Sequence, residues 1–154
     1  MGAIVQLSGI RKSYGVGTPV EAEVLHGIDM RIDEGEFVAL TGPSGSGKST
    51  LLALMGALDV PDGGSVFLDG TDLAAMTERD RAAVRGRRIG FVFQSHRPLP
   101  QCSAWENVLI PTIPVRRSGR PAEAAGETVE ARARRLLERV GLADRLGHRP
   151  AELS

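Results

Sequence analysis

The stretch from residue 42 to residue 50 narrows more than any other what this chain can fold into. It reads Gly42-Pro43-Ser44-Gly45-Ser46-Gly47-Lys48-Ser49-Thr50 and fits G-x-x-x-x-G-K-[ST], the pattern of a phosphate-binding P-loop. The apolar run Phe37-Val38-Ala39-Leu40 ahead of it predicts a strand buried on both faces, and Leu51–Leu58 behind it predicts a helix. Strand, glycine-rich loop and helix in this order are the context in which the pattern binds nucleotide phosphates.

The residue types in this stretch suit phosphate chemistry. Gly42, Gly45 and Gly47 allow the backbone to curl so that successive N–H groups point at phosphate oxygens. The first turn of the following helix adds unpaired N–H groups and the positive end of the helix dipole. Lys48 is then placed to reach the β- and γ-phosphates, and the Ser49 hydroxyl to bind Mg²⁺.

Lysine usage supports the same interpretation. Of the 19 basic residues only two are lysines, Lys12 and Lys48. In a chain that otherwise uses arginine, a compact ammonium is kept where it must fit inside the loop. We therefore predict nucleoside triphosphate binding at this loop.

The remaining pattern predicts a mixed α/β fold. Short apolar or alternating runs predict strands, and periodic or capped runs predict helices, one of them behind the capping box Ser103-Ala104-Trp105-Glu106. The expected strands are Ile4–Leu7, Ile28–Ile32, Val66–Leu68 and Ile89–Phe93, and the expected helices are Asp80–Arg87 and about Pro121 to Gly141.

Charge and composition exclude several classes of protein. The 19 acidic residues balance the 19 basic ones, so there is no electrostatic case for nucleic acid as a partner. Cys102 is the only cysteine, which rules out a disulfide framework. We expect no signal peptide, and no apolar run approaches the roughly 18 residues that a membrane span needs.

Two further residues indicate which family of P-loop proteins the chain resembles. Tyr14, in Ile10-Arg11-Lys12-Ser13-Tyr14-Gly15, and Gln94, which closes Phe91-Val92-Phe93-Gln94, resemble residues of the ABC-transporter nucleotide-binding domain, and the likeness extends over essentially the whole chain. In that family the tyrosine stacks on adenine, and the glutamine contacts Mg²⁺ or the attacking water. Taken alone, Tyr14 would be a half-buried tyrosine at a strand end and Gln94 an ordinary strand-end residue.

The resemblance implies the fold, the partners and the location. It implies a P-loop NTPase core with an antiparallel β subdomain (together about 1–95), and the Q-loop with part of a helical subdomain (about 96–154). ATP and Mg²⁺ are the expected cofactors, bound by Tyr14, residues 42–50 and Gln94, with Ser49 and Gln94 on the metal.

A membrane permease would dock on the region after Gln94, at the cytoplasmic face of the plasma membrane, and the complete protein would be a homodimer. Segments such as Ile89-Gly90-Phe91-Val92-Phe93-Gln94 are similar to the branch that serves lipoprotein-releasing and macrolide-exporting permeases.

The residues for hydrolysis are not all found. Family members carry an Asp-Glu pair after a run of four apolar residues, whereas the only such pair here, Asp33-Glu34, precedes the P-loop in an expected turn. Leu153-Ser154 corresponds to the first two letters of the family signature Leu-Ser-Gly-Gly-Gln. We expect an N-terminal part of the domain without its later strands, which binds ATP weakly and turns it over at background rate.

Other readings of the P-loop fit less well. A small GTPase would need Asn-Lys-x-Asp, but the only asparagine is Asn107, followed by Val108. A P-loop kinase of small substrates explains neither Tyr14 nor Gln94. A non-catalytic product that binds nucleotide or permease without turnover remains the alternative.

Overall fold

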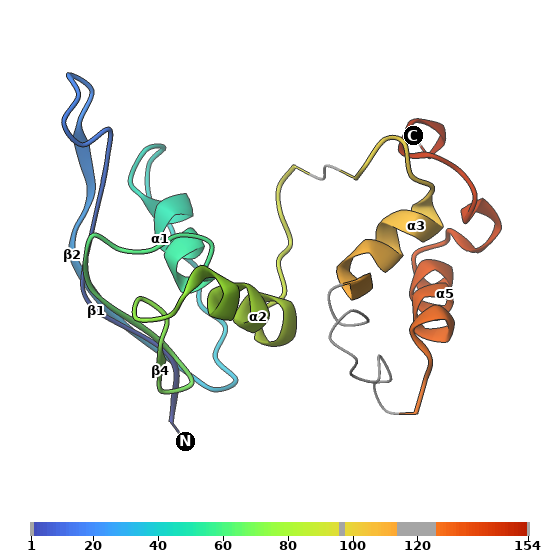
Figure 1. The fold of residues 1–154 in the computed structure, drawn as a ribbon, viewed down its shortest axis with the longest axis horizontal. Coiled ribbons are helices and arrows are strands. Elements are labelled where there is room, and N and C mark those ends of the chain that lie inside the picture. The colour runs from blue at the N-terminus through green and yellow to red at the C-terminus, as the bar shows by residue number, and fades with distance from the viewer. Residues whose placement is uncertain (1, 96–97, 114–125, 154) are drawn as a thin grey trace. The chain divides into compact units, whose positions relative to one another are not determined.

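The computed structural model describes residues 2–95, 98–113 and 126–153, which fall into two compact units, Met1–Phe91 and Val92–Ser154. The division lies near the predicted boundary at about residue 95, although the assignment of these units as subdomains stays a prediction. Each unit is described by itself (Figure 1).

An antiparallel sheet organises the first unit. Two long strands, β1 (Ala3–Tyr14) and β2 (Ala22–Asp33), form a hairpin, and β3 (Gly63–Leu68) pairs with the other edge of β1. The short β4 (Thr71–Asp72) completes the order β2-β1-β3-β4. The predicted strands at 4–7, 28–32 and 66–68 all lie within these elements, and β1 and β2 are much longer than predicted.

Two helices belong to the same unit. Helix α1 (Lys48–Met55) follows the glycine-rich loop, and α2 (Glu78–Arg88) follows β4 (Figure 1). Leu51 and Leu54 of α1 are buried in the core of the unit, where residues from the sheet and its connections join them. The other core residues are Leu7, Ile10, Leu25, Ala57, Val66 and Leu73. Because α1 is held against the sheet by this core, the loop at its N-terminus is held as well.

Two predicted strands are absent from the described sheet. Residues 37–40 and 89–93 adopt no strand conformation, and the exposed fractions of Phe37 and Val92 are 97% and 95%. A strand needs a hydrogen-bonding neighbour, and within the described sheet neither of these runs pairs with another strand. The apolar residues of these two runs predicted buried strands, but in the structure most of them are exposed.

The second unit is helical. It contains α3 (Ala104–Leu109), η1 (Ile110–Thr112), α5 (Val129–Arg139), η2 (Ala143–Arg145) and η3 (Pro150–Glu152). The first amides of α3 donate to the carbonyl oxygens of His148 and Leu146, at 2.8 and 3.0 Å. The predicted capping box is confirmed, since Ser103 Oγ accepts from the Glu106 amide and Glu106 Oε2 accepts from the Ser103 amide.

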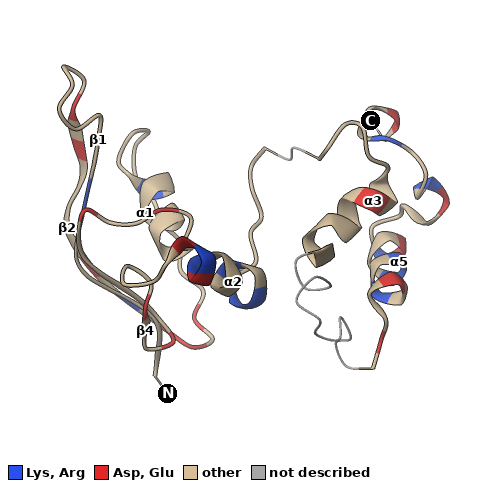
Figure 2. Ribbon diagram, viewed as in Figure 1, with Lys and Arg blue, Asp and Glu red and all other residues tan. Residues whose placement is uncertain are grey.

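Helix α5 is shorter than predicted. The expected start near Pro121 lies outside the described residues, and α5 begins after Thr128, whose hydroxyl accepts from the Ala131 amide. The predicted C-terminal glycine is confirmed, because Gly141 has φ 74° just after the helix. Ala133 and Leu137 are buried, while Leu136 and Val140 are 40% and 68% exposed. In α2 the acidic residues lie in the first turn and arginines fill the last turn, and α5 carries residues of both signs (Figure 2).

Candidate nucleotide-binding site

The glycine-rich loop has the backbone that the sequence requires. Gly42, Gly45 and Gly47 have φ of 149°, 82° and 83°, a region that disfavours residues with a Cβ. A Cβ on Gly47 would lie 2.8 Å from Leu25 Cδ2 and 3.1 Å from the Val24 carbonyl oxygen. Glycine at 47 is thus required twice, by its φ angle and by the close approach of β2.

The loop leads directly into α1. Gly47 occupies the N-cap position and provides no side-chain capping bond. The amides of the first helical turn have no acceptor inside a helix, so those of Lys48, Ser49 and Thr50 are available to an anion. No acidic side chain lies in this first turn to compete with it.

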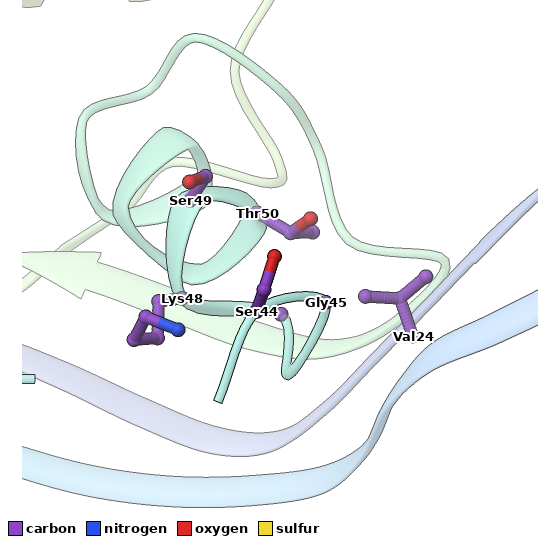
Figure 3. Close-up of a pocket in the computed structure, with 7 residues that line it drawn as sticks. Val24, Ser44, Gly45, Lys48, Ser49 and Thr50 are labelled. Carbon is purple, nitrogen blue, oxygen red and sulfur yellow. The ribbon is translucent and has the colours of Figure 1, made fainter. Parts of the chain in front are cut away.

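A cavity of about 410 Å³ opens beside the loop (Figure 3). Figure 3 shows the Ser44 and Thr50 side chains on the side of the loop that faces Val24 of β2. The residues that line the cavity are Val24, Ser44, Gly45, Gly47, Lys48, Ser49 and Thr50. Backbone amides, hydroxyl groups and one cation are the groups that bind phosphate, and the neutral oxygen of Ser49 is a suitable ligand for Mg²⁺.

The Lys48 ammonium is bound by its own loop. Its Nζ donates to the carbonyl oxygens of Gly42 (2.9 Å) and Pro43 (2.6 Å) and to Ser46 Oγ (3.2 Å). In Figure 3 the side chain lies on the side of the loop away from Val24. A phosphate at the loop would have to compete with these oxygens for the cation.

Tyr14 ends β1, opposite Ala22 of β2, and its side chain is partly exposed. Its hydroxyl donates to Asp59 Oδ2 at 3.2 Å, and the Lys12 ammonium lies 5.4 Å from the ring centroid. No motif in the sequence marks Asp59 or Lys12 as a site residue. The only signal for either was that Lys12 is one of two lysines in an arginine-rich chain.

The other predicted site residues lie in the second unit. Gln94 is exposed, and Leu153 follows η3, where its amide donates to the Pro150 carbonyl oxygen. Ser154 lies outside the described residues. The structure thus brings together the loop and α1, and places Tyr14 on the adjacent hairpin. The roles of Gln94, Leu153 and Ser154 stay predictions.

The Asp33-Glu34 pair is used in a turn, as predicted. Asp33 ends β2, its Oδ1 accepts from Arg31 Nε at 2.9 Å, and its amide donates to Glu36 Oε2 at 2.7 Å. This carboxylate is committed to the turn and its local ion pair.

Among the described residues, no helix has both the length and the hydropathy needed to cross a membrane.

Comparison with curated proteins identifies close relatives. The chain is 51% identical over 142 residues to the lipoprotein-releasing system ATP-binding protein LolD 1 of Rhodopseudomonas palustris, covering 92% of this chain and 60% of that protein. It is 48% identical over 151 residues to the uncharacterized ABC transporter ATP-binding protein YknY of Bacillus subtilis, covering 98% of this chain and 62% of that protein. The chain therefore spans about 60% of the length of these relatives.

A solved structure has the same fold. The ATP-binding cassette MJ0796, in a dimeric post-hydrolysis state bound to ADP and Pi, superposes with a TM-score of 0.81 at 35% identity. The match covers 97% of this chain and 63% of the cassette. The mixed α/β architecture with an antiparallel sheet is thus that of an ABC cassette.

The sequence pattern described as "ABC transporter" matches residues 25–154, which include the P-loop, α1 and the whole second unit. With the cassette fold and the loop geometry, this match shows that the chain belongs to the ABC transporter family of ATP-binding proteins.

Proposed function

We propose that this chain binds Mg-ATP at the P-loop, as the nucleotide-binding part of an ABC transporter subunit. The observation that carries the proposal is the joint geometry of the loop and α1. Gly45 and Gly47, both with positive φ, and the uncapped N-terminus of α1 line one cavity, and the Lys48 ammonium is held on the same loop. Residues 42–50 would hold the phosphates, and Tyr14 would stack on the base.

Mg²⁺ would be held by the Ser49 hydroxyl together with phosphate oxygens. When bound, the ion neutralises charge on the β- and γ-phosphates. The residues of this chain bind and orient the nucleotide, with Lys48 moving from its loop carbonyls to phosphate oxygens.

In the longer protein, ATP binding would be coupled to a membrane permease. The similarity to lipoprotein-releasing ATP-binding proteins supports a permease of that branch. The permease would dock through the region after Gln94 at the cytoplasmic face of the plasma membrane. The dimeric structures of the cassette MJ0796 support a homodimer, in which Leu153 and Ser154 would begin the signature facing the partner's nucleotide.

The second candidate is nucleotide binding without turnover. It is supported by the position of Asp33-Glu34, the only adjacent Asp-Glu pair, whose aspartate is held in a turn by Arg31 and Glu36. With no other such pair to hold the metal and polarise the water, the 154-residue chain is expected to hydrolyse ATP at background rate.

Calorimetric titration of the chain with Mg-ATP tests the proposal. We expect saturable binding that Lys48→Ala abolishes, with the exposed Arg87→Ala as a control that binds normally. Equal ATP affinity in Lys48→Ala would refute the site. Turnover of ATP that depends on Lys48 would refute the non-catalytic candidate.

A further inference from the structure

Lys12, the second of the two lysines, is also bound by a set of converging oxygens. Only 8% of its surface is exposed, and its Nζ donates to the Val60 carbonyl oxygen (2.7 Å), Asp59 Oδ1 (3.1 Å) and Asp62 Oδ1 (3.4 Å). Three acceptors around one compact ammonium make a site that a planar guanidinium would not fit. A lysine fixed this firmly, outside the P-loop, needs an explanation that phosphate binding does not give.

Asp59 links this lysine to Tyr14. Its Oδ1 accepts from the Lys12 ammonium, and its Oδ2 accepts from the Tyr14 hydroxyl at 3.2 Å. Asp62 holds the strand beside them, since its Oδ2 accepts from the Ser13 amide at 2.6 Å. The Tyr14 ring is thus held at its hydroxyl end and along one face, where the ammonium lies 5.4 Å from the centroid.

The cluster shares the hairpin that forms one wall of the phosphate cavity. Lys12 pairs with Leu25 and Tyr14 with Ala22, while Val24, on β2 between them, lines the cavity. Helix α1 starts at the loop and ends four residues before Asp59. The ring is therefore tied both to the strand that lines the cavity and to the turn after the helix that begins at it.

The charge of the cluster indicates what can bind there. Lys12 contributes one positive charge, and Asp59 and Asp62 contribute two negative ones, so the group carries a net negative charge. Such a group repels phosphate and tolerates a neutral, planar ring. Tyr14 as a whole residue is 44% exposed, which leaves surface on which such a ring can stack.

We propose that Asp59, with Lys12 and Asp62, is a positioning cluster that fixes the Tyr14 ring as the platform for the nucleotide base. The proposal rests on the proposed function, since it assumes that the phosphates lie at the P-loop. Fixing the ring before binding removes the entropy cost of ordering it in the complex. Asp59 contacts Tyr14 and acts through it.

The test compares Mg-ATP with Mg-tripolyphosphate, which has the phosphates and no base. Each ligand is titrated against the full chain and its Asp59→Asn and Tyr14→Phe variants. Because a base stacks best on a ring that is already held in place, we expect Asp59→Asn to lose about tenfold in ATP affinity. Tripolyphosphate affinity should not change. Tyr14→Phe keeps the ring, loses the bond to Asp59 and should lose about threefold for ATP alone.

Asp69→Asn is the matched control. Asp69 lies in the turn between β3 and β4, where its carboxylate pairs with Arg88, and its backbone φ of 48° is one that asparagine also tolerates. This variant should bind both ligands like the parent chain. Unchanged ATP affinity in Asp59→Asn and Tyr14→Phe, or equal losses for both ligands, would overturn the proposal. Failure of the parent chain to bind either ligand would instead refute the proposed function, and the positioning role with it.

A spectroscopic measurement separates an effect on the position of the Tyr14 ring from an effect on the stability of the whole chain. Tyr14 is the only tyrosine, so labelling with 3-fluorotyrosine gives a single ¹⁹F resonance from the ring. We expect Asp59→Asn to move this resonance and Asp69→Asn to leave it in place. A resonance unaffected by Asp59→Asn would show that the carboxylate does not set the environment of the ring and would overturn the proposal.

Discussion

The Lys48 ammonium lies 2.6 Å from the carbonyl oxygen of Pro43, the residue that follows the first glycine of the loop. The cation is therefore bound by the same loop in which it is expected to contact the phosphates. Because these acceptors are backbone oxygens, only a ligand of higher charge density, such as a triphosphate, would draw the ammonium away from them.

Replacing Lys48 with arginine should weaken nucleotide binding although it preserves the charge. The compact ammonium lies inside the loop, beside the Gly42 and Pro43 carbonyl oxygens and Ser46 Oγ, and a larger planar guanidinium does not fit there. We expect Lys48→Arg to weaken Mg-ATP binding more than about tenfold, a cost above 1.4 kcal/mol, in a calorimetric titration. The exposed Arg87→Lys is the control for arginine–lysine exchange. ATP binding by Lys48→Arg at parental affinity would contradict the prediction.

Gly64→Ala should strongly destabilise the first unit. A Cβ there would lie 2.3 Å from the Ser8 carbonyl oxygen and 2.5 Å from that of Gly9, at φ 83°. Neither backbone atom can move without disturbing the pairing of β1 with β3. We expect a loss of about 3 kcal/mol in the free energy of unfolding, measured by urea denaturation.

Gly70→Ala separates the two causes of this loss. Gly70 has φ 72°, but nothing lies within 4 Å of its Cβ position. Only backbone strain should act there, at a cost of about 1 kcal/mol. Equal losses in the two variants would show that the predicted contact with Ser8 and Gly9 has no effect.

Asp59 should make stability depend on pH in the acid range. Burial opposes its ionisation, but hydrogen bonds from the Val60 amide, Lys12 and Tyr14 outweigh this, and the pKa of the carboxyl lies below its ordinary value. A lowered pKa stabilises the folded state above the unfolded value of about 3.9, and this contribution is lost as the pH falls through the folded value. Urea denaturation between pH 7 and pH 3 should therefore show a steeper acid loss in the parent than in Asp59→Asn. Parallel curves would contradict the assignment.

Ser103→Ala should destabilise the second unit. The Ser103 amide and hydroxyl donate to Glu106, and these bonds lower the pKa of its carboxyl. Loss of a capping hydroxyl costs about 1 kcal/mol, so hydrogen exchange of the α3 amides should accelerate about fivefold. Ser103→Thr keeps the hydroxyl and should exchange close to the parental rate. Unchanged exchange in the alanine variant would mean that the cap does not stabilise α3.

The sequence by itself determined the elements whose cause is local. The P-loop pattern, the alternation of Ile28, Met30 and Ile32, and the capping box at Ser103 depend on residues close in the chain. The helix behind the P-loop, the strand and the capping box appear in the structure, whereas the strand expected ahead of the P-loop does not. The family assignment followed from the P-loop together with Tyr14, Gln94 and the short segments around them.

Tertiary structure alone decided the rest. Phe37–Leu40 is as apolar as a buried strand, yet a strand forms only where a distant segment offers hydrogen bonds. The same holds for the site. Lys12 and Asp59 are 47 residues apart, and no local pattern indicates that one carboxylate joins that lysine to Tyr14. The local backbone conformation sets the positions of side chains that are close together in the chain. Side chains that are far apart in the chain come into contact only once the sheet has paired and α1 has packed against it.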